Sequence, residues 1–455
     1  MSAPVLSIII LAAMFLLATV LPLNMGALAF VGAFLLGSVV LGMSSNDILA
    51  NFPGGLFLTI VGVTYLFAIA QNNGTVDLLV RGAVRLVGSR VALIPWVMFA
   101  ITAVITAVGA LSPAAVAIIA PIALSFAGKY RINPLLMGMM VIHGAQAGGF
   151  SPIAVYGVTV NGILAKTDLN FSPTALFLSS LVFNLIIALV LFVVLGGRGL
   201  LSSRVSHFVE QAAEARMSVS VGAKGGQDVP FKGFGSGMYG PRDPAGDGVT
   251  ATKERSERIP QLVTIAGLIA LAVIALGFKV DVGFVSITIA IVLALVSPAA
   301  QKGAINKISW STVLLICGML TFVGVLEEAG TIEFVSNGVA GMGLPLVAAL
   351  LICYIGAVVS AFASSTAILA ALIPLAVPFL STGEIGAVGV ICALAVSATI
   401  VDVSPFSTNG ALVLANAPEG VDKDKFYKKI LGYSGIVIVA GPLLAWLALV
   451  VPGWL

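Results

Sequence analysis

Hydroxyl, amide and carboxyl side chains gather at four short interruptions in otherwise apolar segments, at 109–113, 148–152, 363–366 and 402–409. A helix that stops and restarts at such a place leaves backbone N–H groups free at the positive end of its dipole. Ser, Thr and Asn side chains add neutral donors, and this combination suits an anion, a carboxylate in particular. The residues predicted to bind such a substrate are Ser112, Pro113, Ser151, Pro152, Ser364, Ser365, Thr366, Ser404, Pro405, Thr408 and Asn409.

Charge at these interruptions is carried by one acidic residue, Asp402, because no Lys or Arg lies near any of them. Positive charge must therefore come from helix ends, from His143 or from a bound cation. A carboxylate deep in an apolar segment is a functional candidate, so we predict that Asp402 binds Na+ or a proton, with carbonyl groups near Gly148 and Gly149. The alternatives are a structural Asp402 bonded to nearby hydroxyls, and a His143 that forms a hydrogen bond within the bundle instead of carrying a proton.

Two of the interruptions share a motif. Ser151-Pro152 precedes Gly157 as Ser404-Pro405 precedes Gly410, 253 positions later. One such motif alone favours a proline kink between packed helices. The matched pair favours helices that stop, because broken backbone inside a membrane is tolerated where it lines a cavity or a ligand.

The composition indicates what kind of protein holds these residues. Of the 455 residues, 59% are hydrophobic and 9% are charged, which predicts an all-α polytopic membrane protein embedded in the lipid bilayer. The net charge of +3 and the position of the basic residues in loops argue against nucleic acid as a partner. Cys317, Cys353 and Cys392 lie in apolar segments without paired spacing, so they are predicted to be packing residues, not disulfides or metal ligands.

The apolar segments fall into two similar halves. Residues 1–196 and 259–455 are predicted to be transmembrane repeats, joined at 197–258 by a flexible loop rich in Gly, Ser and charge. Segments 91–128 and 344–380 each have a central break, which fits either two crossing helices or a re-entrant hairpin. The predicted spans are 5–22, 25–43, 54–73, 134–165, 173–196, 260–278, 282–298, 310–328, 385–416 and 430–452, with broken helices in 134–165 and 385–416.

Residues in register support the repeat, since Ser112 and Pro121 match Ser365 and Pro374 at the same offset of 253. With re-entrant hairpins each half crosses the membrane five times, an odd number, which makes the halves inverted. Counting each hairpin as two crossings leaves this parity unchanged. The predicted fold is therefore two inverted repeats of five transmembrane helices, each with a re-entrant hairpin and a broken helix.

Basic residues orient this fold. With both termini outside, the 197–258 loop and the basic amphipathic segment 74–90 lie in the cytoplasm with most Lys and Arg, as the positive-inside rule requires. Lys166 and Lys279 are the two basic residues expected outside.

Inverted repeats with helices interrupted at matching positions indicate a secondary transporter whose site lies near the midplane. The alternative in the same class is a cation/proton antiporter or an inorganic oxyanion transporter, with Asp402 as the cation or proton site. A membrane-embedded enzyme is disfavoured because the chain has 2 His and no repeated acidic motif. A channel is disfavoured because paired hairpins favour alternating access.

The chain resembles the divalent anion/sodium symporter family of the ion transporter superfamily, in particular its malonate-carrier-like dicarboxylate transporters. The resemblance covers nearly the whole chain outside 197–258. It rests on the broken segments Gly148–Pro152 and Asp402–Pro405 and on the tips Leu111–Pro113 and Ser364–Thr366. The family's tips carry Ser-Asn-Thr, of which the second tip here keeps the flanking Ser and Thr around a different central residue.

This resemblance implies a Na+- or H+-coupled carrier of a malonate- or succinate-like dicarboxylate in the inner membrane, with no cofactor besides the coupling ion. It implies that hairpin tips contact the substrate carboxylates. It also implies an elevator mechanism, in which a transport part moves against a scaffold, often within a homodimer. The moving part would be 54–165 and 310–416, and the scaffold would be 5–43, 173–196, 260–298 and 430–452.

Overall fold

Helices dominate the computed structural model, which describes residues 2–21, 23–86, 90–200, 247–277, 280–340, 344–362, 364–381 and 383–453. Seven of the helices in these ranges are long and apolar enough to cross a membrane. The predicted all-α, multi-pass membrane fold is therefore confirmed.

The helices of the first half follow the predicted order of apolar spans, amphipathic segment, hairpin and broken helix. They are α1 (Ala3–Val20), α2 (Met25–Phe34, extended by a π-helical turn at Leu35–Val40), α3 (Ser45–Ala50), α4 (Gly54–Asn72), α5 (Thr75–Leu86), α6 (Leu93–Ala107), α7 (Ser112–Lys129), α8 (Pro134–Gly149), α9 (Val155–Leu164), α10 (Pro173–Val194) and α11 (Gly197–Leu200).

The second half repeats that order. Its helices are α13 (Asp247–Gly277), α14 (Val282–Val296), α15 (Pro298–Gln301), α16 (Trp310–Glu328), α17 (Thr331–Ala340), α18 (Pro345–Ser360), α19 (Ser365–Leu380), α20 (Ala387–Ile400), α21 (Thr408–Ala415) and α22 (Lys423–Leu449), with a 3-10 turn at Val401–Val403 after α20.

Equivalent helices of the two halves make equivalent contacts, because α2 packs against α16 as α14 packs against α4. Both crossings depend on glycine. A Cβ on Gly318 would overlap the backbone of Gly26, and a Cβ on Gly62 would overlap the carbonyl of Gly283. The two halves thus share both their element order and their pairings, while their opposite orientation in the bilayer stays a prediction.

The helices pack into two bundles. The hairpin bundle contains α6 to α10 and α18 to α22, which share one large apolar core. The paired-helix bundle contains α1, α2, α4, α13, α14 and α16, which form two smaller cores. This grouping differs from the division implied by the family resemblance, which placed α10 and α22 in the scaffold and α4 and α16 in the moving part, and which stays a prediction. The reason is packing: α10 and α22 bury Ala188 and Ala445 in the core of the hairpin bundle.

The helix boundaries correct the predicted flexible loop at both of its ends, because α11 (Gly197–Leu200) also lies within it. α13 begins at Asp247, so the stretch 247–258 that we predicted as flexible loop is helical. The stretch from Lys253 to Arg258 consists mostly of residue types that favour a helix. The rest of the predicted loop, 201–246, lies outside the described residues.

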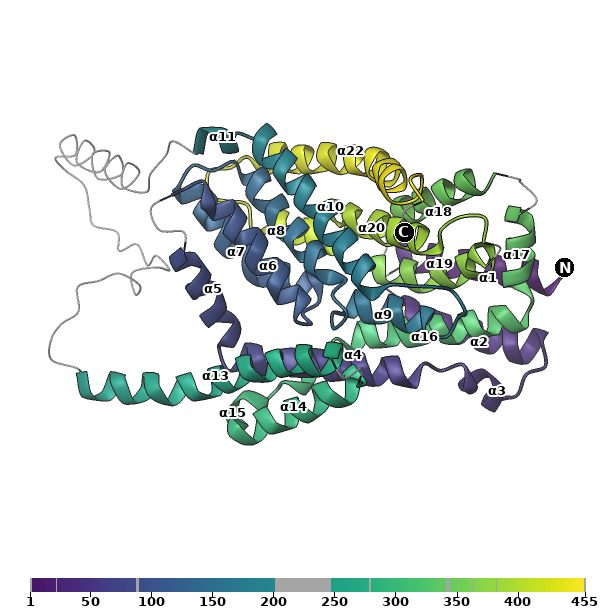
Figure 1. Ribbon diagram of the computed structural model, residues 1–455, viewed down its shortest axis with the longest axis horizontal. Helices are drawn as coiled ribbons and strands as arrows, with labels where there is room; N and C mark the ends of the chain where they lie inside the picture. The colour runs from purple at the N-terminus through teal and green to yellow at the C-terminus, as the bar shows by residue number, and fades with distance from the viewer. Residues whose placement is uncertain are drawn as a thin grey trace.

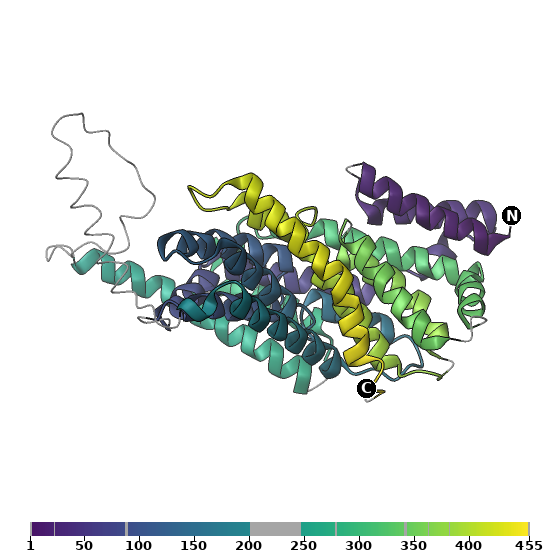
Figure 2. The same cartoon turned by 90° about the horizontal axis from the view of Figure 1, so that it is seen from above.

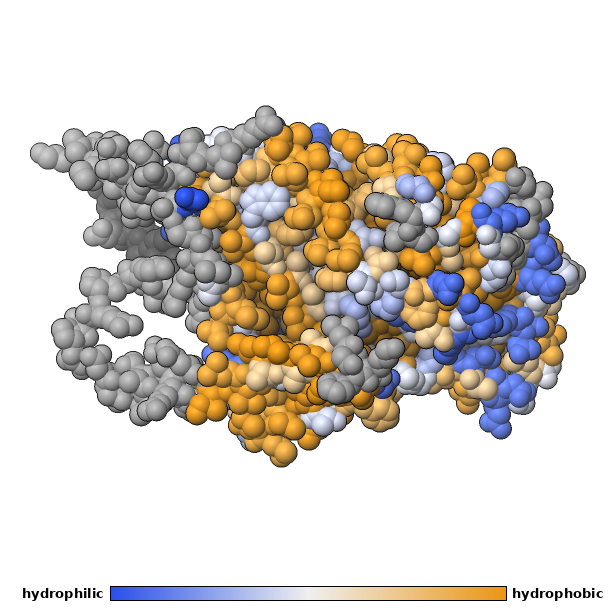
Figure 3. Space-filling model, viewed as in Figure 1, coloured by the Kyte–Doolittle hydropathy of each residue, from blue (hydrophilic) through white to orange (hydrophobic). Residues whose placement is uncertain are grey.

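Figures 1 and 2 show an elongated molecule with α1 and the N-terminus at one end and the beginning of α13 at the other. In Figure 3, hydrophobic side chains cover the middle of the visible face, and hydrophilic ones gather at the end near α3 and α17. An apolar surface that gives way to a polar end is expected of a protein that spans a bilayer.

The predicted orientation can be tested by cysteine labelling, because the native Cys317, Cys353 and Cys392 are buried and give little background. We expect that a cysteine at Asp168, in the exposed α9–α10 loop, reacts with an impermeant maleimide added to intact cells. A cysteine at the exposed Glu419 should react after permeabilisation. The opposite pattern would show that both termini lie inside.

Candidate functional site

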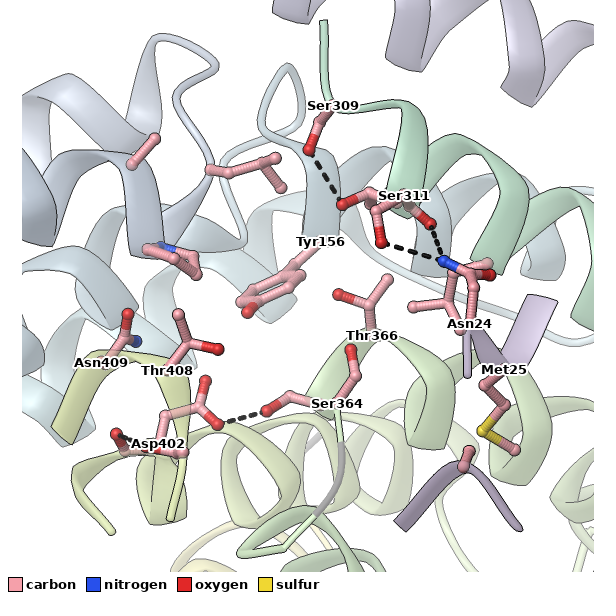
Figure 4. Close-up of a pocket in the computed structure, with 18 of the residues that line it drawn as sticks. Asn24, Met25, Tyr156, Ser309, Ser311, Ser364, Thr366, Asp402, Thr408 and Asn409 are labelled. Carbon is pink, nitrogen blue, oxygen red and sulfur yellow. Dashed lines mark hydrogen bonds between the residues drawn. The ribbon is translucent and has the colours of Figure 1, made fainter. Parts of the chain in front are cut away.

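A cavity of about 540 Å³ lies between the two bundles, within the size range of small-molecule sites. Its wall contains the first turns of six helices: α2, α7, α9, α16, α19 and α21. Figure 4 shows Asp402, Thr408 and Asn409 on one wall, Asn24 and Ser311 on another, and the ring of Tyr156 between them. The lining residues are Ala18, Leu23, Asn24, Met25, Leu111, Pro113, Ala114, Tyr156, Ser309, Ser311, Thr312, Leu315, Phe362, Ser364, Ser365, Thr366, Asp402, Phe406, Ser407, Thr408 and Asn409.

The helix N-termini direct the positive ends of their dipoles toward this cavity, and no Lys or Arg is among its described lining residues. At α7 and α19 the N-cap residues Leu111 and Ser364 make no side-chain capping bond, which leaves first-turn N–H groups available. α21 differs, because the hydroxyl of its N-cap Ser407 accepts a hydrogen bond from the N–H of Gly410. The arrangement is suited to a ligand with more than one anionic group.

The shared Ser-Pro motifs build the two helix breaks by the same contact. A Cβ on Gly157 would overlap the carbonyl oxygen of Ser151, and a Cβ on Gly410 would overlap that of Ser404. Each restarting helix therefore lies directly on the carbonyl of the Ser that precedes the Pro. The absence of a side chain at these glycines is what brings the first turns of α9 and α21 to the cavity.

Asp402 lies at the end of a buried hydrogen-bond chain. Ser360 Oγ donates to Ser365 Oγ at 2.9 Å, and Ser365 Oγ donates to Asp402 Oδ1 at 2.5 Å. The backbone carbonyl of Asp402 accepts a hydrogen bond from Ser407 Oγ. The carboxylate is thus held by the tip of one hairpin while it faces the cavity.

Asn409 connects the two halves beside Asp402. Its Nδ2 donates to Ser112 Oγ at 2.8 Å, whereas its buried Oδ1 has no hydrogen-bond partner in the described part of the chain. A buried, unpaired amide oxygen is costly and indicates a ligand or water that is absent from the protein alone. Carboxylate and amide oxygens are hard ligands, so Asp402 and Asn409 fit an alkali cation.

Most of the predicted substrate residues come together in this cavity. Ser112 does not line the cavity but accepts a hydrogen bond from Asn409, which does. Ser404 and Pro405 are buried in the turn before α21. Ser151 and Pro152 shape the turn before α9 without lining the cavity. The predicted residues that line it are Pro113, Ser364, Ser365, Thr366, Asp402, Thr408 and Asn409.

Gly148 and Gly149 are not at the cavity, because α8 continues through Gly149 and breaks after it. A Cβ on Gly148 would overlap the carbonyl of Ala103, so this glycine allows α8 to pack closely on α6. Gly149 leaves room for the ring of Tyr156. The structure thus gives both glycines packing contacts, and the Gly148 carbonyl accepts the N–H of Ser151.

His143 is buried away from the cavity, among α8, α10 and α22. Its Nδ1 lies 2.8 Å from Asn184 Oδ1, and its Nε2 lies 2.7 Å from the hydroxyl of Tyr433. Because Asn184 Nδ2 donates to the carbonyl of Ser180, its Oδ1 is the acceptor for the His143 N–H. Both ring nitrogens are therefore satisfied within the bundle, which favours the structural alternative over the proton carrier.

The first turns of α2 and α16 line the cavity, which the sequence did not predict. Asn24 caps α2 by accepting from the N–H groups of Gly26 and Ala27, and its Nδ2 donates to Ser311 at the start of α16. The sequence does indicate Asn24 as a helix N-cap. It does not indicate that the first turns of α2 and α16 lie against the broken helices. Tyr156 and the stacked pair Phe362 and Phe406 were missed for the same reason.

Two comparisons with known proteins bear on the fold and on the first third of the chain. Residues 1–149 match the family described as "Dicarboxylate carrier protein MatC N-terminus". The crystal structure of the YdaH transporter from Alcanivorax borkumensis superposes with a TM-score of 0.53 at 15% identity, covering 88% of this chain and 86% of that one. The chain shares the fold of that transporter. A search of curated proteins gave no match.

The resemblance to dicarboxylate carriers is confirmed over residues 1–149, and the fold is that of a known transporter. Within the described ranges, no three His, Cys, Asp or Glu side chains come together as metal ligands. The substrate and the coupling ion are inferred below from the residues that line the cavity.

Proposed function

We propose that the protein is a secondary active transporter for a small dicarboxylate of the malonate or succinate class. The observation that carries this proposal is the wall of six helix N-termini around a cavity without Lys or Arg among its described lining. Two carboxylates can be bound there by N–H groups and hydroxyls at separate helix ends. The dicarboxylate carrier match over residues 1–149 supports the same substrate class.

A coupling cation follows from the charge of the cavity. Asp402 would add a third negative charge beside a bound dicarboxylate, in a buried position where repulsion is weakly screened. Na+ or a proton at Asp402 removes this conflict, and the unpaired oxygen of Asn409 offers Na+ a second ligand. Coupling by mutual neutralisation would make anion and cation bind together.

The mechanism we propose is elevator-like, with the hairpin bundle moving against the paired-helix bundle. The cavity lies between these bundles, and the hairpin bundle contributes both hairpin tips and both broken helices to it. The glycine crossings join α2 to α16 and α4 to α14, which suits a rigid scaffold. A homodimer and an inner-membrane location are part of this proposal and rest on the family resemblance.

Purified protein in proteoliposomes tests the proposal directly. We expect saturable uptake of labelled malonate or succinate that depends on a Na+ or H+ gradient. Uptake of sulfate or phosphate with no competition by dicarboxylates would favour the oxyanion alternative. Cation flux without any anion requirement would favour an antiporter built on Asp402.

The hairpin-tip hydroxyls give a site-specific prediction. Ser365→Ala removes the donor to Asp402, and Ser112→Ala removes the acceptor of the Asn409 amide. We expect each variant to raise the KM for dicarboxylate roughly three- to tenfold, because each loses one hydrogen bond that supports the site without contributing directly to the charge of the substrate. The control is Ser381→Ala, an exposed serine outside the cavity. Unchanged kinetics in both tip variants would exclude the tips as the binding site.

A further inference from the structure

A second cavity, of about 270 Å³, opens on the other side of the interface between the two bundles. It is lined by α9, α16 and α19, which also contribute to the central cavity, and by Asn51 after α3. On α9 the central cavity reaches Tyr156 and the second cavity reaches Gly162, a separation of roughly 9 Å along the helix. The same three helices thus form a thin barrier between two openings.

The second cavity is lined by charged side chains of both signs, whereas the central cavity is lined by the N-termini of helices. Lys166, in the loop after α9, and Glu327, at the end of α16, both line it and are both exposed. Lys166 belongs to the hairpin bundle side and Glu327 to the paired-helix bundle, so opposite charges face one space from the two bundles. Lys166 is the basic residue among the described lining of either cavity.

Lys166 is also an exception in the charge distribution of the chain. With the predicted orientation, the described basic residues near the membrane lie on the cytoplasmic side, and Lys166 lies outside. The positive-inside rule therefore does not explain the position of Lys166. Its place in the lining of a cavity close to the central one suggests a functional role instead.

We propose that the second cavity is an external anion-recruiting site, in which Lys166 attracts the dicarboxylate and Glu327 limits its residence. This rests on the proposed anion transport and adds the place where the substrate is first bound. A charge at the mouth of a cavity with low-dielectric walls focuses its field into that cavity and raises the local concentration of counter-ions. Both groups are exposed, so their effects are modest and screened by salt.

The opposite signs of the two charges make the test sharp. In uptake from the outer side, Lys166→Gln should raise the KM for dicarboxylate roughly two- to fivefold and Glu327→Gln should lower it by a similar factor. The maximal rate should not change. Both effects should fade when ionic strength is raised with choline chloride at constant Na+, because the Debye length falls to about 3 Å near 1 M. Lys166→Arg should keep the wild-type KM.

The matched control is Glu328→Gln, which removes the same charge one residue away, from a side chain that does not line the cavity. An equal effect of Glu328→Gln and Glu327→Gln would reduce the result to general surface charge and overturn the proposal. A shift of the maximal rate in the same direction in Lys166→Gln and Glu327→Gln would instead show an ion pair that locks the two bundles, and would also overturn it.

The kinetics separate this inference from the proposed function. If the wild-type protein shows no saturable dicarboxylate uptake, both fall. If the wild type transports normally and Lys166→Gln has the wild-type KM at low salt, the external site alone is refuted. Should the glutamine variant fold poorly, Lys166→Cys treated with a cationic or an anionic thiol reagent gives the same comparison, since the native cysteines are buried.

Discussion

Asp402→Asn is expected to abolish concentrative uptake while the protein remains folded and still exchanges bound substrate. The side chain keeps its size, but it loses the charge that holds the cation and the charge-assisted bond from Ser365. Such interactions are worth roughly 2–3 kcal/mol, which corresponds to roughly a 100-fold fall in the rate of accumulation against a gradient. The measurement is uptake into proteoliposomes with and without a Na+ or H+ gradient, beside counterflow of labelled substrate at equal concentrations.

The control for this variant is Glu384→Gln, an acidic residue in the exposed loop before α20. It should transport like the wild type. Accumulation by Asp402→Asn with normal ion dependence would make Asp402 structural, and the coupling ion would then bind elsewhere. If Asp402→Asn loses both exchange and accumulation, Asp402 takes part in substrate binding itself.

Gly410→Ala and Gly157→Ala should each destabilise the protein and suppress transport, although they add one methyl group. In both cases the new Cβ meets a backbone carbonyl, which cannot rotate away as a side chain can. The turn must open to admit the methyl group, at a cost of about 1–3 kcal/mol, and the first turn of the following helix leaves the cavity. Thermal unfolding in detergent and uptake measure the two effects.

Gly432→Ala is the matched control, because this glycine lies on α22 and a Cβ there meets nothing within 4 Å. It should leave Tm and uptake close to those of the wild type or raise Tm slightly, since Ala favours helix over Gly. Wild-type stability in both Gly157→Ala and Gly410→Ala would show that the Ser-Pro turns yield easily and do not position α9 and α21.

The sequence predicted the broken helices well because their signals are local. Pro and Gly determine where a helix can end, and the matched motifs around Pro152 and Pro405 placed both breaks within a few residues. The break in α8 was placed slightly early, at Gly148, because glycine in a helix has two meanings. It can end the helix, or it can let another helix approach, and the choice depends on a neighbour such as Ala103 that the local sequence does not reveal.

The parts that sequence reasoning missed are tertiary. Asn24 and Ser311 are ordinary helix-start residues, and they reach the cavity because α2 and α16 cross there at Gly26 and Gly318. The grouping of α10 with the hairpins also depends on which apolar face meets which. Hydropathy identifies a membrane helix, but nearly every face of such a helix is apolar, so it does not identify the partner.

The unequal caps of the restarting helices have a stereochemical consequence. The N-cap of α21 is Ser407, whose hydroxyl closes the first turn, whereas the N-cap of α9 is Ala154, which has no such group. Asp402 likewise stands on one wall alone. A dicarboxylate with two identical ends, bound across this cavity, would therefore lose its mirror symmetry and meet a chiral environment. The two hydrogens of a malonate methylene would become distinguishable, and a substituted relative would be accepted in one handedness.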